Sequence, residues 1–283
     1  MPSARRQRLR KTPSRGKLRP NIKLDAPRTI VTFKALDMPL SEENRKALVL
    51  GNQALRRLRA ARRERVVASS YPGLVSWALD SFMQYGLHRI VALGTGMTAE
   101  WNKKRLLNCI VLSRSLMETV GALFRVLDDT YKLLPTEDIR GIHSLLTVAM
   151  FGRRDLEPGD KSLPKAVNAL TGIDRLEKAY PGSRQMYDWV CEYVHPNCDG
   201  YLLFGQPNLT TADAELGEHL VFERPGAVST ATLGMHFLDW ADGFVRKYET
   251  LFKNQVEALD RKFGEKVDRW PGDPGASWRP SDE

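Results

Sequence analysis

The chain has 283 residues, of which 42% are hydrophobic and 27% charged, which is typical of a soluble protein with a sizeable core and excludes a chain disordered throughout. No apolar h-region follows the basic start, and no uninterrupted apolar run reaches about 18 residues, so we expect neither a secretory signal nor a membrane span. Three cysteines, Cys109, Cys191 and Cys198, are too few for a disulfide scaffold. They favour a reducing, cytoplasmic location.

The formal net charge of +9 comes from the first 28 residues, which hold ten basic groups against the single acid Asp25. Their prolines and lack of an apolar pattern predict a flexible basic tail over residues 1–28. Such a tail attracts polyanions by counterion release. Contacts to RNA or DNA are expected from Arg5, Arg6, Arg8, Arg10 and Lys11. A solubilising leader with no specific partner, an anchor to acidic membranes and a transit peptide are the alternatives.

The hydrophobic pattern predicts an all-α protein, an irregular multi-helix bundle in one domain over residues 29–268, with a short flexible tail over 269–283. The predicted helices cover residues 41–68, 74–91, 98–134, 137–150, 163–180, 183–195 and 227–263.

Two smaller features complete the predicted organisation. A turn is predicted at Gly94-Thr95-Gly96, and a small hairpin from residues 202–204 and 220–222. The middle of the first predicted helix also carries six arginines, which form either a solvated face or an extension of the tail's electrostatic footprint. They are Arg56, Arg57, Arg59, Arg62, Arg63 and Arg65.

The longest well-patterned segment, residues 98–134, contains two adjoining stripes at helical spacing. Arg114, Glu118 and Arg125 share one stripe, bordered by Leu107 and Val111. A charged side chain in a core-forming helix is costly unless it is paired or hydrogen-bonded, so this row is predicted to face another helix. The other stripe is apolar and predicts core residues. Its members are Leu106, Ile110, Met117, Val120, Phe124 and Leu127.

A second polar signature closes the helix predicted at residues 183–195. Tyr187, Cys191 and His195 follow one another at four-residue steps and therefore line one face, while Pro196 ends the helix with His195 at its C-terminus. The helix dipole favours a cation there. We expect Tyr187 or His195 to pair with Glu118 and to leave Arg114 free to bind an anion. The alternative is a buried structural network that orients two helices.

Cofactor and metal motifs are incomplete in this chain. Cys191, His195 and Cys198 form a C-x3-H-x2-C cluster with ligand types that suit zinc, but a fourth ligand is missing, so we predict no metal. A nucleophilic Cys191/His195 pair lacks a third, orienting group. No complete dinucleotide, Walker or G-x-S-x-G motif occurs, and we predict no cofactor.

The runs 112–118 and 187–196 contain an R-S-x-x-E motif and a Y...H-P motif. Over residues 70–250 the chain thereby resembles a family of bacterial all-helical proteins of unknown function, in which a serine stands near the place of Cys191. That family is loosely similar to HEPN (higher eukaryotes and prokaryotes nucleotide-binding) domains, several of which are ribonucleases in toxin and phage-defence systems. The resemblance implies an RNA-related role. None of the five histidines follows an arginine at the four- to six-residue spacing of the HEPN nuclease signature.

We therefore expect a cytosolic helical binding module, associated with defence or stress, with Arg114, Glu118, Tyr187 and His195 as an interhelical polar site. One alternative is a phosphodiester-cleaving, ribonuclease-like enzyme in which His195 is the general acid/base and Arg114 stabilises an anion. Another is a structural subunit that binds a protein partner or a second copy of the chain. An open pocket lined by the four side chains would favour the enzyme, and a closed, fully paired network would favour the other two.

Overall fold

The computed structural model describes residues 32–36, 40–153, 164–196, 198–208, 210, 213–217 and 220–263. The tails expected at residues 1–28 and 269–283 lie outside these ranges, and so do the arginines and the lysine expected to contact nucleic acid. The described residues all belong to one contact unit, which begins at Val31. Helices dominate this unit, and the prediction of an all-α multi-helix bundle is confirmed.

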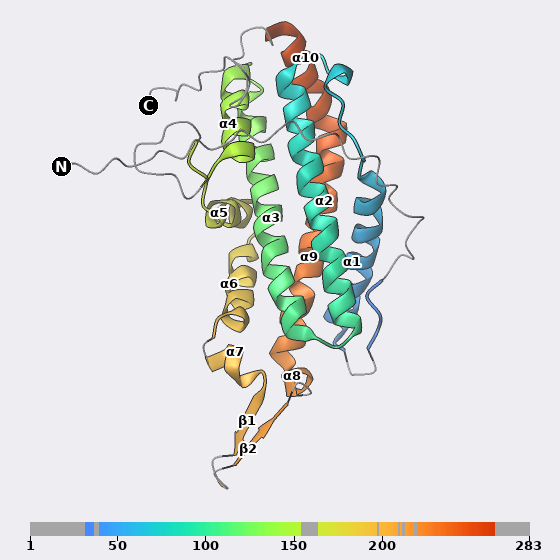
Figure 1. The fold of residues 1–283 in the computed structure, drawn as a ribbon, viewed down its shortest axis with the longest axis vertical. Coiled ribbons are helices and arrows are strands. Elements are labelled where there is room, and N and C mark those ends of the chain that lie inside the picture. The colour runs from blue at the N-terminus through green and yellow to red at the C-terminus, as the bar shows by residue number, and fades with distance from the viewer. Residues whose placement is uncertain are drawn as a thin grey trace, which may run out of the picture. The chain divides into compact units, whose positions relative to one another are not determined.

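The elements follow one another as in Figure 1. The helices are α1 (Glu42–Ala61), α2 (Leu74–Asn102), α3 (Leu106–Leu133), α4 (Ile139–Phe151), α5 (Ala169–Ala179), α6 (Ser183–Val194), α7 (Cys198–Leu202), α8 (Leu220–Glu223), α9 (Pro225–Lys247) and α10 (Lys253–Phe263). A 3-10 turn covers Ala68–Ser70, and a π-helical turn, Tyr248–Phe252, joins α9 to α10. Strands β1 (Gly205–Asn208) and β2 (Asp213–Leu216) pair antiparallel, with Gly205 opposite Leu216.

Helix α3 is the centre of the bundle. It contacts α2, α4, α5, α6 and α9, and Figure 1 shows it between the α5–α6 side and the long helices α2 and α9. The apolar stripe predicted for this helix is buried, except that Phe124 is only half-buried and packs edge-on against Tyr180. Periodicity alone therefore located the core side of α3.

Among the described helices, α3 is the one that passes a length-and-composition test for crossing a membrane. The uninterrupted-run criterion did not select it because polar residues such as Arg114 and Glu118 interrupt the run. Of its apolar window, 56% is buried inside the bundle, and buried core helices pass the same test. Its length and composition are therefore weak evidence for a membrane span.

Several predicted boundaries are wrong for identifiable reasons. Gly94-Thr95-Gly96 is not a turn but lies inside α2, where a Cβ atom on Gly94 would be 3.0 Å from side-chain atoms of Leu55 and Leu238. The helix break lies instead before Leu106, at Lys104, whose φ is +60°. Glycine here permits close helix packing and does not end the helix.

The hairpin was predicted at the wrong residues. Leu203 and Val221, in the two segments expected to pair, are 1% and 3% exposed, because they pack against the core next to α7 and in α8. The strands are the more polar segments between them. Two further helices are shorter than predicted: α1 ends at Ala61, and α5 begins only after Asn168, whose side chain accepts from the backbone N–H of Leu170 at 3.1 Å.

A buried carboxylate joins three parts of the bundle away from α3. Asp80 of α2 is 0% exposed and accepts from the guanidinium of Arg63, the phenol of Tyr71 and, at 2.9 Å, the phenol of Tyr248. Burial, followed by the charge of Asp80, raises the pKa of Tyr248, so this phenol remains a donor. The network holds the end of α1 and the π-helical turn against α2.

Candidate functional site

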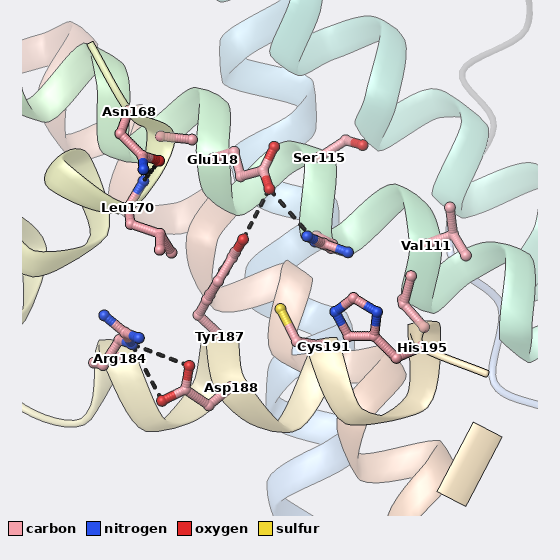
Figure 2. Close-up of a pocket in the computed structure, with 13 residues that line it drawn as sticks. Val111, Ser115, Glu118, Asn168, Leu170, Arg184, Tyr187, Asp188, Cys191 and His195 are labelled. Carbon is pink, nitrogen blue, oxygen red and sulfur yellow. Dashed lines mark hydrogen bonds and ion pairs between the residues drawn. The ribbon is translucent and has the colours of Figure 1, made fainter. Parts of the chain in front are cut away.

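Residues of helices α3, α5 and α6 line an open pocket of about 620 Å³ (Figure 2). All four predicted site residues line it. Arg114 and Glu118 of the predicted polar row face α6, whereas Arg125, its third member, does not line the pocket and has Arg175 of α5 as a charged neighbour. The lining residues are Val111, Arg114, Ser115, Glu118, Asn168, Ala169, Leu170, Arg184, Tyr187, Asp188, Cys191, Val194 and His195.

A glycine pair sets the distance between α3 and α5. A Cβ atom on Gly172 of α5 would lie 2.5 Å from the carbonyl carbon of Gly121 on α3, closer than real Cβ contacts. The two backbones therefore touch at a point where neither residue has a side chain. This contact brings the first residues of α5 to the pocket, where Asn168 and Leu170 form one end of the wall (Figure 2).

The turn between α5 and α6 is fixed by one carboxylate. Glu177 accepts from the backbone N–H groups of Gly182 at 3.1 Å and Arg184 at 2.8 Å, and from the hydroxyl of Ser183 at 3.3 Å. These hydrogen bonds, that of the Arg184 N–H first, lower the pKa of Glu177. Gly182 has φ +93°, a conformation that favours glycine. The start of α6 is therefore held to the end of α5.

The centre of the site is a cluster of three side chains that bridges α3 and α6. The phenol of Tyr187 donates to Oε1 of Glu118 at 2.8 Å, and Nε of Arg114 lies 3.4 Å from the same oxygen. The Arg114 guanidinium is 6.0 Å from the centre of the Tyr187 ring. Tyr187 is 4% exposed, whereas the side chains of Arg114 and Glu118 are 30% and 33% exposed. Tyr187 forms the floor, and the two charged groups reach solvent.

The protonation states of the cluster follow from burial and from these contacts. Burial raises the pKa of Tyr187 to about 12, and the Glu118 carboxylate acts in the same direction while Arg114 opposes it. Hydrogen bonding with Tyr187 is the main cause that raises the pKa of Arg114. Burial also raises the pKa of the Cys191 thiol. At neutral pH the pocket therefore presents a phenol, a thiol and a guanidinium cation.

His195 lies at the end of α6 and does not pair with Glu118. The helix ends at Val194, and His195 has extended backbone angles (φ −76°, ψ 145°), as expected for the residue before Pro196. Its backbone N–H donates to the carbonyl of Cys191 at 2.9 Å. Figure 2 shows its ring beside Cys191, on the side that faces α3. The imidazole is exposed, and within the described part of the chain its nitrogens make no recorded hydrogen bond.

The pocket also contains residues that the sequence analysis did not select. Arg184 and Asp188 lie at the end opposite His195 (Figure 2), and Nε of Arg184 donates to Oδ1 of Asp188 at 3.0 Å. Arg184 also pairs with Asp174 of α5 at 2.7 Å. The helical spacing of Arg184, Asp188, Cys191 and His195 was a usable signal, since it places all four on one face. Asn168 gave a weaker signal, because its place near the pocket depends on the turn before α5.

The structure offers little for a metal. The side chain of Cys198, needed for the C-x3-H-x2-C cluster, lies outside the described residues, and within those residues no group of three or more His, Cys, Asp or Glu side chains is arranged to hold an ion.

Comparisons of the chain with protein-family models, with curated proteins and with solved structures found no match. Of the resemblance noted from the two motifs, the all-helical fold is what the structure supports.

Proposed function

We propose that the protein is a binding module that takes a small anionic ligand into the pocket between α3, α5 and α6. A volume of about 620 Å³ suits a small molecule or part of a larger one. The lining mixes apolar walls, such as Val111 and Leu170, with a few charged and polar groups, which is typical of sites that hold a ligand in one orientation.

The observation that carries this proposal is the state of Arg114. Its guanidinium is held beside Tyr187 and, through Nε, 3.4 Å from Glu118, while 30% of the side chain remains exposed in the pocket. A guanidinium held in this way can donate two parallel hydrogen bonds to a carboxylate or a phosphate. His195, exposed at the same end of α6 as Cys191, supplies a further N–H donor. Both groups suit an anion, and neither requires a change in the Tyr187–Glu118 bond.

The proposal is tested by titrating the full chain with inorganic phosphate and with ribose 5-phosphate in a calorimeter, with ribose as the uncharged comparison. We expect the phosphorylated probe to bind and ribose to fail. Arg114→Gln removes a charged donor pair and should weaken binding by about tenfold to a hundredfold. Arg246→Gln is the matched control, because Arg246 is an ion-paired arginine of α9 that does not line the pocket. If neither phosphate probe binds, or if both variants behave alike, anion binding by Arg114 is wrong.

A second candidate is phosphodiester cleavage with His195 as general acid/base and Arg114 as the group that stabilises the anion. Supporting it, all four residues line one open pocket. Weighing against it, the described residues offer the His195 ring no orienting partner, unlike most catalytic histidines. Incubation with an end-labelled RNA separates the two functions: an enzyme would produce fragments that disappear in His195→Ala while RNA affinity is retained. Intact RNA would leave the binding module.

The RNA-related and defence-associated roles implied by the motif resemblance belong to the same proposal. Contacts from Arg5, Arg6, Arg8, Arg10 and Lys11 to nucleic acid are a further part of it, resting on the charge of residues 1–28.

A further inference from the structure

The positive charge of the helical body is concentrated in one short segment. Residues 45–65 contain eight basic residues, seven of them arginine, and one acid, Glu64. Outside this segment and the first 28 residues, the chain has 25 basic and 32 acidic residues. Residues 29–283 are formally neutral in total, but residues 45–65, called the α1 region below, are strongly basic and the remainder is acidic. Such segregation creates a local field that a neutral total hides.

Half of these basic residues are not neutralised by a neighbour. Arg45, Arg56, Arg62 and Arg65 are exposed, and within the described residues none of them has a recorded ion pair. Some exposed cations elsewhere in the bundle are paired, as Lys132 is with Asp128 and Lys262 with Glu137 at 2.8 Å. Cations without an ion pair also occur singly or in pairs elsewhere, as at Lys103 and Lys104, but residues 45–65 bring four such arginines together within 21 positions.

Geometry places two of them on one outward line. Arg45 and Arg56 are eleven residues apart, close to three full helical turns, so they share a face about 16 Å apart along the axis. Val49, 55% exposed, marks the same face as solvent-facing. Arg62 and Arg65 extend the basic region beyond the end of α1 at Ala61.

Like charges are also close enough in this region to disfavour one another. The pKa of Arg59 is lowered by burial first and then by the neighbouring charge of Arg62. Holding two guanidinium ions in this way costs free energy that a bound anion would recover.

We infer that the α1 region, with Arg45, Arg56, Arg62 and Arg65, is a binding surface for the phosphate backbone of double-stranded nucleic acid. Arginine suits phosphate because its planar fork donates two hydrogen bonds at once. Residues 45–65 contain no aromatic side chain on which an unpaired base could stack. A duplex carries one charge per about 1.7 Å, more than a single strand, so a surface of charge alone favours the duplex. This surface is separate from the α3–α6 pocket.

The experiment measures fluorescence anisotropy of labelled 20-base-pair RNA and DNA duplexes, and of one single strand, across a salt series. All proteins are full-length and have the ten basic residues of positions 1–28 changed to Gln, so that the tail contributes little. They are Arg5, Arg6, Arg8, Arg10, Lys11, Arg15, Lys17, Arg19, Lys23 and Arg28. The test variant changes Arg45, Arg56, Arg62 and Arg65 to Gln. The control makes the same charge change at ion-paired cations of α3 and α10: Lys132, Lys253, Arg261 and Lys262. Circular dichroism confirms that both remain helical.

We expect the tail-neutralised protein to bind both duplexes more tightly than the single strand. The test variant should lose at least tenfold in affinity, and the slope of log K against log salt should become shallower by about 0.9 for each phosphate contact removed. The control should change little.

Three results would overturn the inference. They are absence of duplex binding once the tail is neutralised, equal losses in the test variant and the control, and binding to phosphatidylserine vesicles in place of the duplexes. The last would reassign the α1 region to an anionic membrane surface.

Discussion

The phenol of Tyr187 and the guanidinium of Arg114 meet at one atom, Oε1 of Glu118, at 2.8 Å and 3.4 Å. A single carboxylate oxygen of α3 therefore accepts from α6 and also anchors the cation proposed to bind a ligand. This arrangement links the stability of the α3–α6 contact to the position of Arg114.

Removing the Tyr187 hydroxyl tests how much this hydrogen bond stabilises the α3–α6 contact. We expect Tyr187→Phe to lower the free energy of unfolding by about 1–3 kcal/mol, since a hydrogen bond to a charged acceptor is lost in a buried position. Urea denaturation followed by circular dichroism measures the change. Tyr201→Phe, at a side chain 69% exposed, should be neutral. Equal stability of Tyr187→Phe and the unsubstituted protein would show that the bond stabilises nothing.

Asp80 should be among the most sensitive positions of the bundle. Asp80→Asn leaves the size unchanged but removes the charge that Arg63, Tyr71 and Tyr248 share, and breaking a buried pair in this way costs about 3–5 kcal/mol. Thermal and urea unfolding should both report it. Asp213→Asn, at an exposed residue of β2, is the matched change. A loss below about 1 kcal/mol would mean that the network is not needed for stability.

The glycine contact between α3 and α5 predicts opposite signs for two similar substitutions. Gly172→Ala should destabilise the protein by about 1–3 kcal/mol, because its Cβ would press on the backbone at Gly121. It should also weaken ligand binding by displacing α5. Gly243→Ala, in the last two turns of α9 with no neighbouring element within 4 Å of the new Cβ, should stabilise the protein by roughly 0.5–1 kcal/mol. Calorimetric unfolding of both variants measures the sign of each change in the free energy of unfolding. A Gly172→Ala variant that is more stable than the unsubstituted protein would contradict the close contact between Gly172 and Gly121.

His236 predicts how stability depends on pH. Burial lowers the pKa of this histidine in the folded protein below its ordinary value of 6.5, so the unfolded chain takes up the proton first as pH falls. The contribution of His236 is therefore complete above pH 6.5 and is lost as pH falls below that value. His236→Gln should show a flatter decline in the free energy of unfolding between pH 7 and pH 5 than the unsubstituted protein. Identical slopes would mean that the histidine titrates alike in both states.

The features of the site that could be predicted from the sequence are those that depend on helical periodicity. Helical spacing predicted that Arg114 and Glu118 face another helix and that Tyr187 lies on the face that meets them. Pro196 predicted the end of α6, which the structure has at Val194. Each of these depends on residues within a few turns of one another. The choice between Tyr187 and His195 as the partner of Glu118 needed the packed structure.

Contacts between distant residues could not be predicted in the same way. Tyr248 is 168 positions from Asp80, and no local pattern connects them. The glycines of α2 were interpreted as a turn because a turn and a close helix contact both require a residue without a side chain. Only the neighbouring helices, through Leu55 and Leu238, distinguish the two.

Glu177 gives the pocket wall a particular mechanical property. Because the Glu177 carboxylate of α5 accepts hydrogen bonds from the backbone N–H groups of Gly182 and Arg184, we expect α5 and α6 to move together. This pair of helices contacts α3 most closely where Gly172 of α5 meets the backbone of Gly121. Any widening of the pocket between α3 and α6 would have to break the Tyr187–Glu118 hydrogen bond, so the size of the ligand that fits is tied to the stability of that bond.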